Sequence, residues 1–593
     1  MLQPAFGLDC LAGGVMVKNH WFRKISSGLL LLVVACLGCF YLSFNFDSGP
    51  DLAELLPRET LALVQVRDLA QACTSLQRSP LGQELLAPAL EQKLLILGGE
   101  ERTRARILGA VEGFRRLVSH PLFGAVFSRQ SALALLPAER SFSSPASYLS
   151  ANTLFIARTR IKVAPSVLLG WAEAGQSSLE TSVYQGAVLT TIQGPGGGSL
   201  VVAVVDTTII CALERRAVER CLELMAERLL RPRFNLANDP LYQQLRADIR
   251  GREDVLIYAN PGPLAELTSL AGEDTAPHSS RFTPGQRLFF SHQAAGRQDY
   301  LQLLLRGFGD TRSGLVEQYR LAPAVYNRGL AGIGAEASIY FWTNWLDPAA
   351  LWQVFSRSPT LETAGALFYI GQQVYHHTGK DIDTLSHMFG PQFSFFVQDL
   401  AGAAPERAPL LCFQFQVRDP LGVQELLNLV LEEVPTRTTS LAGGRAVSVI
   451  MADGLIQPAY LLRGDQLVVA DDISMIAGLF DEQAPKLVAD PDFRGVGSAF
   501  TQANNLLLYT RIDQLNQGLR QLVLWILESQ EAMGQISSEQ HALLLTSGVT
   551  PLFESLAHVR SQGIRLRQAG PDLHLELTLY SPTTRTLGRS EGN

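Results

Sequence analysis

Cysteine is scarce in this chain, which has 7 cysteines among 593 residues. A scaffold built from disulfides is therefore excluded, and a chain of this length can bury cores large enough not to need one. Charge is also sparse, since charged residues make up 18% of the sequence and hydrophobic residues 47%. This balance excludes a mainly disordered chain. The net charge of −7 gives no general field that would attract nucleic acid, so we expect no nucleic-acid partner.

Several short signatures of catalysis are also absent. The chain has no HExxH helix, no GxGxxG turn and no SxxK motif, which argues against common metallopeptidases and dinucleotide enzymes, and we predict no cofactor. The glycine run at 194–198 is not a phosphate-binding loop, because the strand-like run 199–205 follows it where a helix would be needed. We interpret it as a hairpin loop. A hydrolase is still compatible with the sequence if its site is assembled from distant residues.

Histidine and aspartate are concentrated at one place, where His376, His377 and His387 flank Asp381 and Asp383. Two neutral imidazoles and a carboxylate could bind zinc. However, adjacent histidines on a helix point about 100° apart, and the spacing fits no familiar zinc signature. We therefore predict a polar surface segment and no metal site.

One segment has the composition of a membrane span. Ile25 to Phe44 contains no charged residue, and as a helix it would cover about 30 Å, the thickness of a hydrocarbon core. Basic residues precede this segment and acidic residues follow it: Lys18, Arg23 and Lys24, then Asp47, Asp51 and Glu54. By the positive-inside rule the N-terminus stays in the cytoplasm and the bulk of the chain is exported. The alternative is a cleaved lipoprotein signal at Val33–Cys36, with Cys36 as the lipidated first residue.

Two distant stretches of the exported part resemble each other. Asp239–Tyr242 leads to Val255–Tyr258, and Asp490–Phe493 leads after an equal interval to Leu506–Tyr509. Other landmarks recur in the same order: Phe-Gly at 123–124 and at 389–390, a strand entering a helix from 207 and from 466, and a glycine turn near 296 and near 570. A shared order of landmarks is typical of an internal duplication.

The sequence thus predicts an α+β fold of two duplicated lobes, each a mixed, largely antiparallel sheet covered by helices, after one N-terminal transmembrane helix. The predicted parts are a cytoplasmic N-terminus (1–24), a transmembrane anchor (25–44), a first repeat (53–310), a linker (311–329), a second repeat (330–582) and a disordered tail (583–593). In both repeats, strand-like runs end at an aspartate that can cap the next helix, as at Asp68 and Asp419.

An aromatic cluster in the second repeat is the candidate binding site. It contains Tyr340, Phe341, Trp342, Trp345, Trp352 and Phe355. In a strand, Tyr340 and Trp342 share one face, opposite to Phe341 and Trp345. The cluster is either core packing or a groove for a lipid, a peptide or a glycan, and the groove would be lined by Tyr340, Trp342, Trp345 and Trp352.

Two further features each have two interpretations. Cys211 ends a strand and Cys221 lies on the inward stripe of the next helix, so the two could form a disulfide or be two small core residues. The arginines of 102–116 accompany an apolar stripe, which indicates a solvated helix face or a contact with anionic lipid head groups.

The start of the exported part resembles a known family. The run Leu56-Pro57-Arg58-Glu59-Thr60-Leu61-Ala62-Leu63-Val64-Gln65-Val66-Arg67-Asp68-Leu69, followed by Ser79-Pro80-Leu81-Gly82, is similar to the opening of an uncharacterised bacterial family of membrane-anchored extracytoplasmic proteins, a domain of unknown function. The resemblance covers about thirty residues and the overall layout. It implies a bacterial inner-membrane protein with one span and a periplasmic bulk, and it provides no catalytic residues.

These observations favour a non-enzymatic envelope protein that binds or scaffolds another envelope component, a protein or a lipid, while tethered by its N-terminal helix. One alternative is a carrier or sensor of a hydrophobic ligand such as a lipid. The other is a hydrolase with a dispersed active site. A continuous apolar cavity would favour the carrier, an exposed apolar patch the scaffold, and a cleft with converging carboxylates or histidines the enzyme.

Overall fold

The computed structural model describes residues 51–98, 100–120, 123–142, 144–159, 178–193, 199–227, 234–249, 253–264, 285–307, 322–357, 361–400, 409–451 and 457–582. The predicted anchor at 25–44, the segment 1–24, Cys36, the glycine run 194–198, the tail 583–593 and most of the predicted linker lie outside these residues. Within them, no helix is both long enough and apolar enough to cross a membrane.

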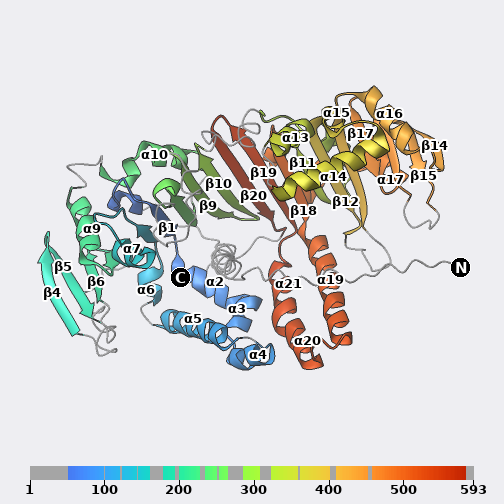
Figure 1. Ribbon diagram of the computed structural model, residues 1–593. Coiled ribbons are helices and arrows are strands. Elements are labelled where there is room, and N and C mark those ends of the chain that lie inside the picture. The colour runs from blue at the N-terminus through green and yellow to red at the C-terminus, as the bar shows by residue number, and fades with distance from the viewer. Residues whose placement is uncertain are drawn as a thin grey trace.

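The fold is α+β, a mixture of helices and antiparallel sheet, as the sequence predicts (Figure 1). The strands of the first half are β1 (Ala62–Val66), β2 (Ser131–Leu135), β3 (Thr153–Arg158), β4 (Ser178–Tyr184), β5 (Ala187–Gln193), β6 (Ser199–Val205), β7 (Thr208–Ala212), β8 (Val255–Ala259), β9 (Arg287–Ala295) and β10 (Gln298–Arg306). Those of the second half are β11 (Ala337–Thr343), β12 (Phe389–Gln398), β13 (Leu410–Val417), β14 (Thr436–Leu441), β15 (Gly444–Val449), β16 (Ala459–Arg463), β17 (Gln466–Ala470), β18 (Leu506–Arg511), β19 (Ser561–Ala569) and β20 (Asp572–Tyr580).

Helices are inserted between these strands at a few places. In the first half they are η1 (Leu52–Leu55), α2 (Leu69–Arg78), α3 (Pro80–Leu85), α4 (Leu90–Ile96), α5 (Glu101–Ser119), α6 (Phe123–Phe127), α7 (Pro145–Asn152), α9 (Arg215–Glu227), η3 (Leu236–Asn238) and α10 (Pro240–Ala247). In the second half they are η6 (Gly329–Gly332), α13 (Pro348–Arg357), α14 (Leu361–Thr378), α15 (Ile382–His387), α16 (Pro420–Val430), α17 (Ile473–Phe480), η8 (Leu487–Ala489), α18 (Pro491–Gly495), η9 (Ser498–Thr501), α19 (Ile512–Ala532), α20 (Ser538–Leu544), η10 (Leu545–Val549) and α21 (Thr550–Leu556).

The strands pair in the same order in the two halves. In the first half the hydrogen-bonded order is β4-β5-β6-β7-β3-β2-β1-β8-β9-β10. In the second half it is β14-β15-β16-β17-β13-β12-β11-β18-β19-β20. Adding ten to each strand number of the first order therefore gives the second. All these pairs are antiparallel, although β1–β2 and β11–β12 are each separated by helices in the sequence.

The halves join edge to edge through β10 and β20, so that the 20 strands of the described residues form one sheet (Figure 1). The register of this seam is symmetric. Gln302 at the centre of β10 lies opposite Glu576 at the centre of β20, and Leu301–Leu577 and Leu303–Leu575 flank this pair. The β10–β20 pairing therefore has an approximate two-fold axis, which passes through the Gln302–Glu576 pair. Each half keeps its own hydrophobic core, one running from Leu52 to Leu304 and the other from Leu330 to Tyr509.

Matching helix starts hold matching strands in the two halves. Asp239 accepts hydrogen bonds from the backbone N–H groups of Leu241 and Tyr242, at 2.9 and 3.0 Å, and so caps α10. Asp490 caps α18 in the same way, through the second and third residues after it, at 2.8 and 3.1 Å. Both caps precede a proline, which suits the first helical position because it lacks the N–H that would have no partner there.

In each half, the aromatic residue of the capped helix packs on the tyrosine of the following strand. These are Tyr242 on Tyr258 and Phe493 on Tyr509. The rings of Tyr242 and Tyr258 lie edge to face at 5.5 Å, and those of Phe493 and Tyr509 at 5.1 Å. Tyr258 is the fourth residue of β8 and Tyr509 the fourth of β18, and each is 1% exposed. Burial of this aromatic surface stabilises the helix against the strand in each half.

A second matching contact fixes the closing hairpins. The Asp254 carboxylate, just before β8, accepts a hydrogen bond from the Ala294 N–H of β9 at 2.9 Å. The Asn505 side-chain oxygen, just before β18, accepts one from the Gln568 N–H of β19 at 2.7 Å. These two residues end the equal intervals found in the sequence, so the equal spacing corresponds to a helix and turn held against one strand.

One pair of sequence landmarks, Phe123-Gly124 and Phe389-Gly390, does not mark equivalent positions in the two halves. Phe123 begins the helix α6, whereas Phe389 begins the strand β12, so the two Phe-Gly pairs do not occupy the same place.

The predicted caps at Asp68 and Asp419 are confirmed, since each accepts a hydrogen bond from the backbone three residues later, at 2.9 and 3.0 Å.

The helices of the two halves also meet away from the sheet. Gln540 at the start of α20 donates a hydrogen bond to the backbone carbonyl of Ile96 at the end of α4, at 2.9 Å. Figure 1 shows α3 and α4 beside α20 and α21 on one side of the molecule. The seam between the halves thus has a strand pair and a helix contact.

Candidate functional site

The four aromatic residues of the predicted groove are divided between the core and two cavities. Tyr340 and Trp342 face the second core and are 1% and 3% exposed. Trp342 also lines a cavity at one end of its own strand and its neighbours, whereas Trp352 of α13 lines another cavity between helices. Trp345 is partly buried just after β11. The side chain of Phe355 lies outside the part of the structure that is described.

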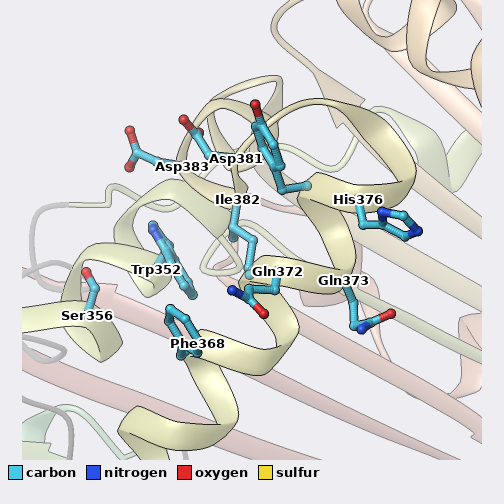
Figure 2. Close-up of a pocket in the computed structure, with 11 residues that line it drawn as sticks. Trp352, Ser356, Phe368, Gln372, Gln373, His376, Asp381, Ile382 and Asp383 are labelled. Atoms are coloured by element: carbon cyan, nitrogen blue, oxygen red, sulfur yellow. The ribbon is translucent and has the colours of Figure 1, made fainter.

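The first cavity, here called the helical cavity, lies between α13, α14 and the start of α15 and measures about 920 Å³ (Figure 2). Its lining residues are Trp352, Ser356, Phe368, Gly371, Gln372, Gln373, Tyr375, His376, Asp381, Ile382 and Asp383. Figure 2 shows Trp352, Phe368 and Ile382 gathered at its centre. The apolar wall thus comes from three different helices.

Local sequence signals place these helices. Gly379 ends α14 with a φ of 65°, and its N–H bonds to the Tyr375 carbonyl at 2.8 Å, which is a typical glycine helix end. Asp381 then caps α15 by accepting the Thr384 N–H at 2.6 Å. The backbone and hydroxyl hydrogen bonds from Thr384 lower the pKa of the Asp381 carboxyl. The rim of the helical cavity therefore carries an ionised carboxylate at neutral pH.

Much of α14 around this cavity exposes apolar surface. The side chains of Phe368, Tyr369 and Tyr375 are 68%, 64% and 63% exposed, and Ile370 is 49% exposed. Large apolar residues grouped in one place on a surface mark interaction sites more often than scattered ones do. This helix is therefore the main exposed aromatic feature that we identify in the second half.

The helical cavity does not bring Ser356 and His376 together. Ser356 donates its hydroxyl hydrogen bond to the Gln353 carbonyl at 3.3 Å, and Figure 2 shows Ser356 and His376 at opposite sides of the cavity. A serine nucleophile needs its base within hydrogen-bond distance. The segment Gly588–Gly592 has the Gly-x-Ser-x-Gly spacing of a nucleophile elbow, but it lies outside the described residues and no strand-like run leads directly into it.

The three histidines of the sequence analysis lie on two helices. His376 and His377 are at the end of α14, with ring centroids 5.2 Å apart, and His387 ends α15. The His387 Nδ1 lies 2.8 Å from the Asp383 carbonyl oxygen. In the described parts of the chain, no three His, Cys, Asp or Glu side chains are grouped so that they could hold a metal ion.

The second cavity, here called the amide pocket, lies at one end of the strands β11, β12, β13 and β17, against residues 324–329, and measures about 660 Å³. Its lining is rich in carboxamides: Asn327, Gln392, Gln414, Gln416 and Gln466. Trp342 and Tyr326 contribute aromatic surface, and Tyr326 is 69% exposed. Residues 324–329 belong to the predicted linker, but here they form one wall of the pocket.

The strand registers bring the amides together. Ser394 lies opposite Trp342 on one side and opposite Gln414 on the other, and Gln416 lies opposite Gln466. The Gln414 side-chain oxygen accepts hydrogen bonds from the Ser394 hydroxyl at 3.2 Å and from the Gln466 amide at 3.3 Å. These side chains therefore form a connected polar layer on the inner face of β12, β13 and β17.

Sequence reasoning did not identify the amide pocket. The signal was the alternation Phe413-Gln414-Phe415-Gln416, which has polar residues at every second position of a strand. In the usual pattern the polar face of such a strand is exposed, yet Gln414 is only 5% exposed. Only the tertiary structure shows that the glutamines point inward.

The cysteines of the described chain are free thiols: Cys73, Cys211, Cys221 and Cys412. Burial raises the pKa of the Cys211 and Cys221 thiols to about 12 in each case. A thiol with such a high pKa carries almost no reactive thiolate at neutral pH. Both cysteines are thus inert packing residues in this structure.

The motif that resembles the extracytoplasmic family has a structural explanation. Leu56 and Leu63 are fully buried, and Ser79 caps α3 by accepting the Gly82 N–H at 2.9 Å. A Cβ at Gly82 would lie 1.7 Å from the Leu76 carbonyl oxygen, so only glycine fits there. These motif residues therefore have structural roles in the packing of the first half.

No match was found when the chain was compared with protein-family models, curated proteins and solved structures.

Proposed function

We propose that this protein is a non-enzymatic, membrane-tethered binding or scaffold protein of the bacterial envelope, with its bulk in the periplasm. The observation that carries the proposal is the exposed aromatic surface of α14 around the helical cavity. Its partner would be an envelope component that presents apolar side chains next to a basic group, because Asp381 and Asp383 make the rim acidic. A hydrophobic ligand such as a lipid is the second candidate, supported by the apolar wall of Trp352, Phe368 and Ile382.

This location implies a short tether. Asp51 caps η1, and Leu52 and Leu55 enter the first core directly after it. If residues 25–44 span the membrane, only residues 45–50 separate the membrane from this core, and six extended residues reach about 20 Å. The first half would therefore lie close to the bilayer surface.

We also propose that the two halves, 53–310 and 330–582, are duplicated copies of one α+β unit, as the shared order of sequence landmarks suggests. The identical strand order, the matching caps of Asp239 and Asp490 and the matching contacts of Asp254 and Asn505 support this origin. Since the helices inserted after β1 and β11 differ, the copies would have diverged mainly in their inserted helices, where the helical cavity lies.

The location is tested with reporter fusions that are active only after export. Fusions after Asp51, Asp310 and Leu587 are each expected to be active, because the basic residues before Ile25 retain the N-terminus in the cytoplasm. An inactive reporter at any of the three positions would contradict the topology.

The binding role is tested by photo-crosslinking in the native membrane. A photoreactive residue in place of Phe368 is expected to give a discrete adduct, whereas the same residue at Val183, which is 70% exposed on the distant strand β4, is not. Asp383→Lys should weaken the adduct if the partner is basic. Mass spectrometry then separates a protein adduct from a lipid adduct, and equal labelling at both positions would rule out the helical cavity as the binding surface.

A further inference from the structure

The amide pocket has a composition that the fold itself does not require. In the first half, the row of side chains matched by strand pairing to Trp342, Ser394, Gln414 and Val468 consists of Gln65, Ala132, Ile156 and Ile210. Ala132, Ile156 and Ile210 are core residues there. The same fold is thus built with apolar side chains in the place where the second half has Ser394 and Gln414.

Burying polar groups at core positions costs free energy even when they are hydrogen bonded to each other. Ser394 and Gln414 are 4% and 5% exposed, so they have lost nearly all contact with solvent. Gln416 and Gln466 extend this polar layer to the pocket. Since Ala132 and Ile156 show that an apolar solution exists, the buried amides indicate a requirement other than folding.

The wall above the amides is held in place before any ligand binds. The Asn344 side chain donates to the Pro323 carbonyl at 2.8 Å, and Val325 and Asn504 exchange two backbone hydrogen bonds of 3.0 Å. Asn327 donates to the Tyr340 hydroxyl at 2.6 Å. A preformed pocket lowers the cost of ordering the protein on binding.

Gly329 allows the wall to lie close to the amides. A Cβ at this position would be 3.0 Å from the Gln414 side-chain oxygen and 3.5 Å from that of Asn327. The wall therefore contacts the sheet at Gln414, and both Gly329 and Gln414 line the pocket.

From this arrangement we infer that the amide pocket binds a neutral saccharide. Each carboxamide offers a donor and an acceptor, which matches sugar hydroxyl groups, because each of these also donates and accepts. Tyr326, which is 69% exposed, provides an apolar surface for the C–H face of a sugar ring, and the buried Trp342 also lines the pocket. Arg328 and Asp465 at the rim have opposite charges, so the pocket has no net formal charge that would require an ionic ligand.

The size of the pocket agrees with such a ligand. Its volume of about 660 Å³ is in the range of small-molecule pockets, which hold roughly 300–1,000 Å³. The inference is independent of the helical cavity, since the two cavities share no lining residue.

Binding is tested on the full-length protein in detergent micelles. An array of immobilised neutral and acidic oligosaccharides identifies a binder, and calorimetric titrations with cellobiose and with N,N′-diacetylchitobiose measure affinity. We expect saturable binding of at least one neutral saccharide, accompanied by a change in tryptophan fluorescence from Trp342. Binding of acidic saccharides alone, or no binding at millimolar concentration, would overturn the inference. Binding of a neutral peptide without any saccharide would do the same.

Variants separate binding from folding. Gln414→Leu introduces a side chain similar in size to Ile156 but leaves the buried Ser394 hydroxyl without its acceptor, so the melting temperature should fall modestly while affinity falls at least tenfold. Gln424→Leu, at a partly exposed glutamine on α16 whose amide donates to Asn428, is the matched control and should bind as the wild type does. If Gln414→Leu fails to fold, Tyr326→Ala decides, because Tyr326 is exposed and its loss should weaken binding alone. Unchanged affinity in a folded Gln414→Leu variant would refute the saccharide site. If that variant does not fold, unchanged affinity in Tyr326→Ala would refute it.

Discussion

Asp490 caps α18 and binds an arginine at the same time. One carboxylate oxygen accepts the N–H groups of Asp492 and Phe493, and the other lies 2.7 Å from the Arg511 guanidinium. The Arg511 and Asp490 side chains are only 13% and 12% exposed, so this ion pair is largely removed from water. Loss of one partner of such a pair leaves the other charge without compensation.

We therefore predict that Asp490→Ala destabilises the protein by more than a simple cap loss. Asp472→Ala at the start of α17 is the matched change, and it should cost about 0.5–2 kcal/mol, the usual value for a cap. Asp490→Ala should cost clearly more, because Arg511 is then buried without this partner. Urea denaturation of the two variants measures both losses, and equal losses would contradict the role of the ion pair.

The surroundings of His574 on β20 predict a contribution to stability that depends on pH. Burial is the main cause that lowers its pKa, and the nearby Arg567 acts in the same direction, while Asp248, Asp572 and Glu576 oppose them. Because the folded pKa is below the unfolded value of about 6.5, the stabilisation is fully present above that pH and is lost as the pH falls toward the folded pKa.

We predict that His574→Gln removes part of this pH dependence. The free energy of unfolding of the wild type, relative to the variant, should decrease between pH 7.5 and 5.5, as measured by urea denaturation at several pH values. His387→Gln serves as the control, since the His387 side chain is 52% exposed. A constant difference between wild type and His574→Gln across this range would show that His574 does not contribute.

At the residue scale, the sequence predicts local signals well and inward-facing polar side chains poorly. Asp68 and Asp419 are caps, as expected, because capping depends on a few neighbouring residues. Gln414 could not be placed, since its burial depends on β12, β17 and the chain near Gly329, which are distant in sequence.

At the scale of elements, strands and hairpins were predictable where period-two patterns met a turn. The hairpin of β9 and β10 turns at Gly296, and that of β19 and β20 turns at Gly570, both with positive φ. The side-by-side pairing of β1 with β2 and β8 could not be predicted, because these contacts join segments that are separated by helices. The predicted equivalence of the two Phe-Gly pairs was wrong, because a two-residue match does not distinguish a helix from a strand.

The position of each strand in the sheet predicts its protection from solvent exchange. β4 and β14 lie at the two ends of the described strand order, whereas β10 and β20 lie in its middle and are paired on both sides. We predict slow hydrogen exchange in β10 and β20 and fast exchange in β4 and β14, because edge strands open at low free-energy cost. Hydrogen exchange with mass spectrometry measures this, and fast exchange at β10 and β20 would mean that the halves separate readily.

At the scale of the whole molecule, the symmetric seam predicts how an isolated half behaves. Residues 51–307 retain the first core, but without β20 they leave the edge of β10 unpaired, with Leu301, Leu303 and Leu305 along the strand. An unpaired edge strand pairs readily with another copy of itself. Because the register is symmetric about Gln302, two β10 strands can pair as β10 and β20 do, with Gln302 opposite Gln302.

We therefore predict that the isolated fragment 51–307 forms a homodimer at micromolar concentration, as measured by sedimentation equilibrium. The control is Gln302→Glu, which places two carboxylates directly opposite each other and should shift the fragment to monomer. In the whole protein, Glu576 is tolerated at the matching place because Arg565 binds it through two hydrogen bonds of 2.8 and 2.6 Å, whereas Ser291 lies opposite Gln302 on β9. A monomeric wild-type fragment, or a dimer that Gln302→Glu leaves intact, would show that the pairing of β10 with β20 does not follow from a self-complementary edge.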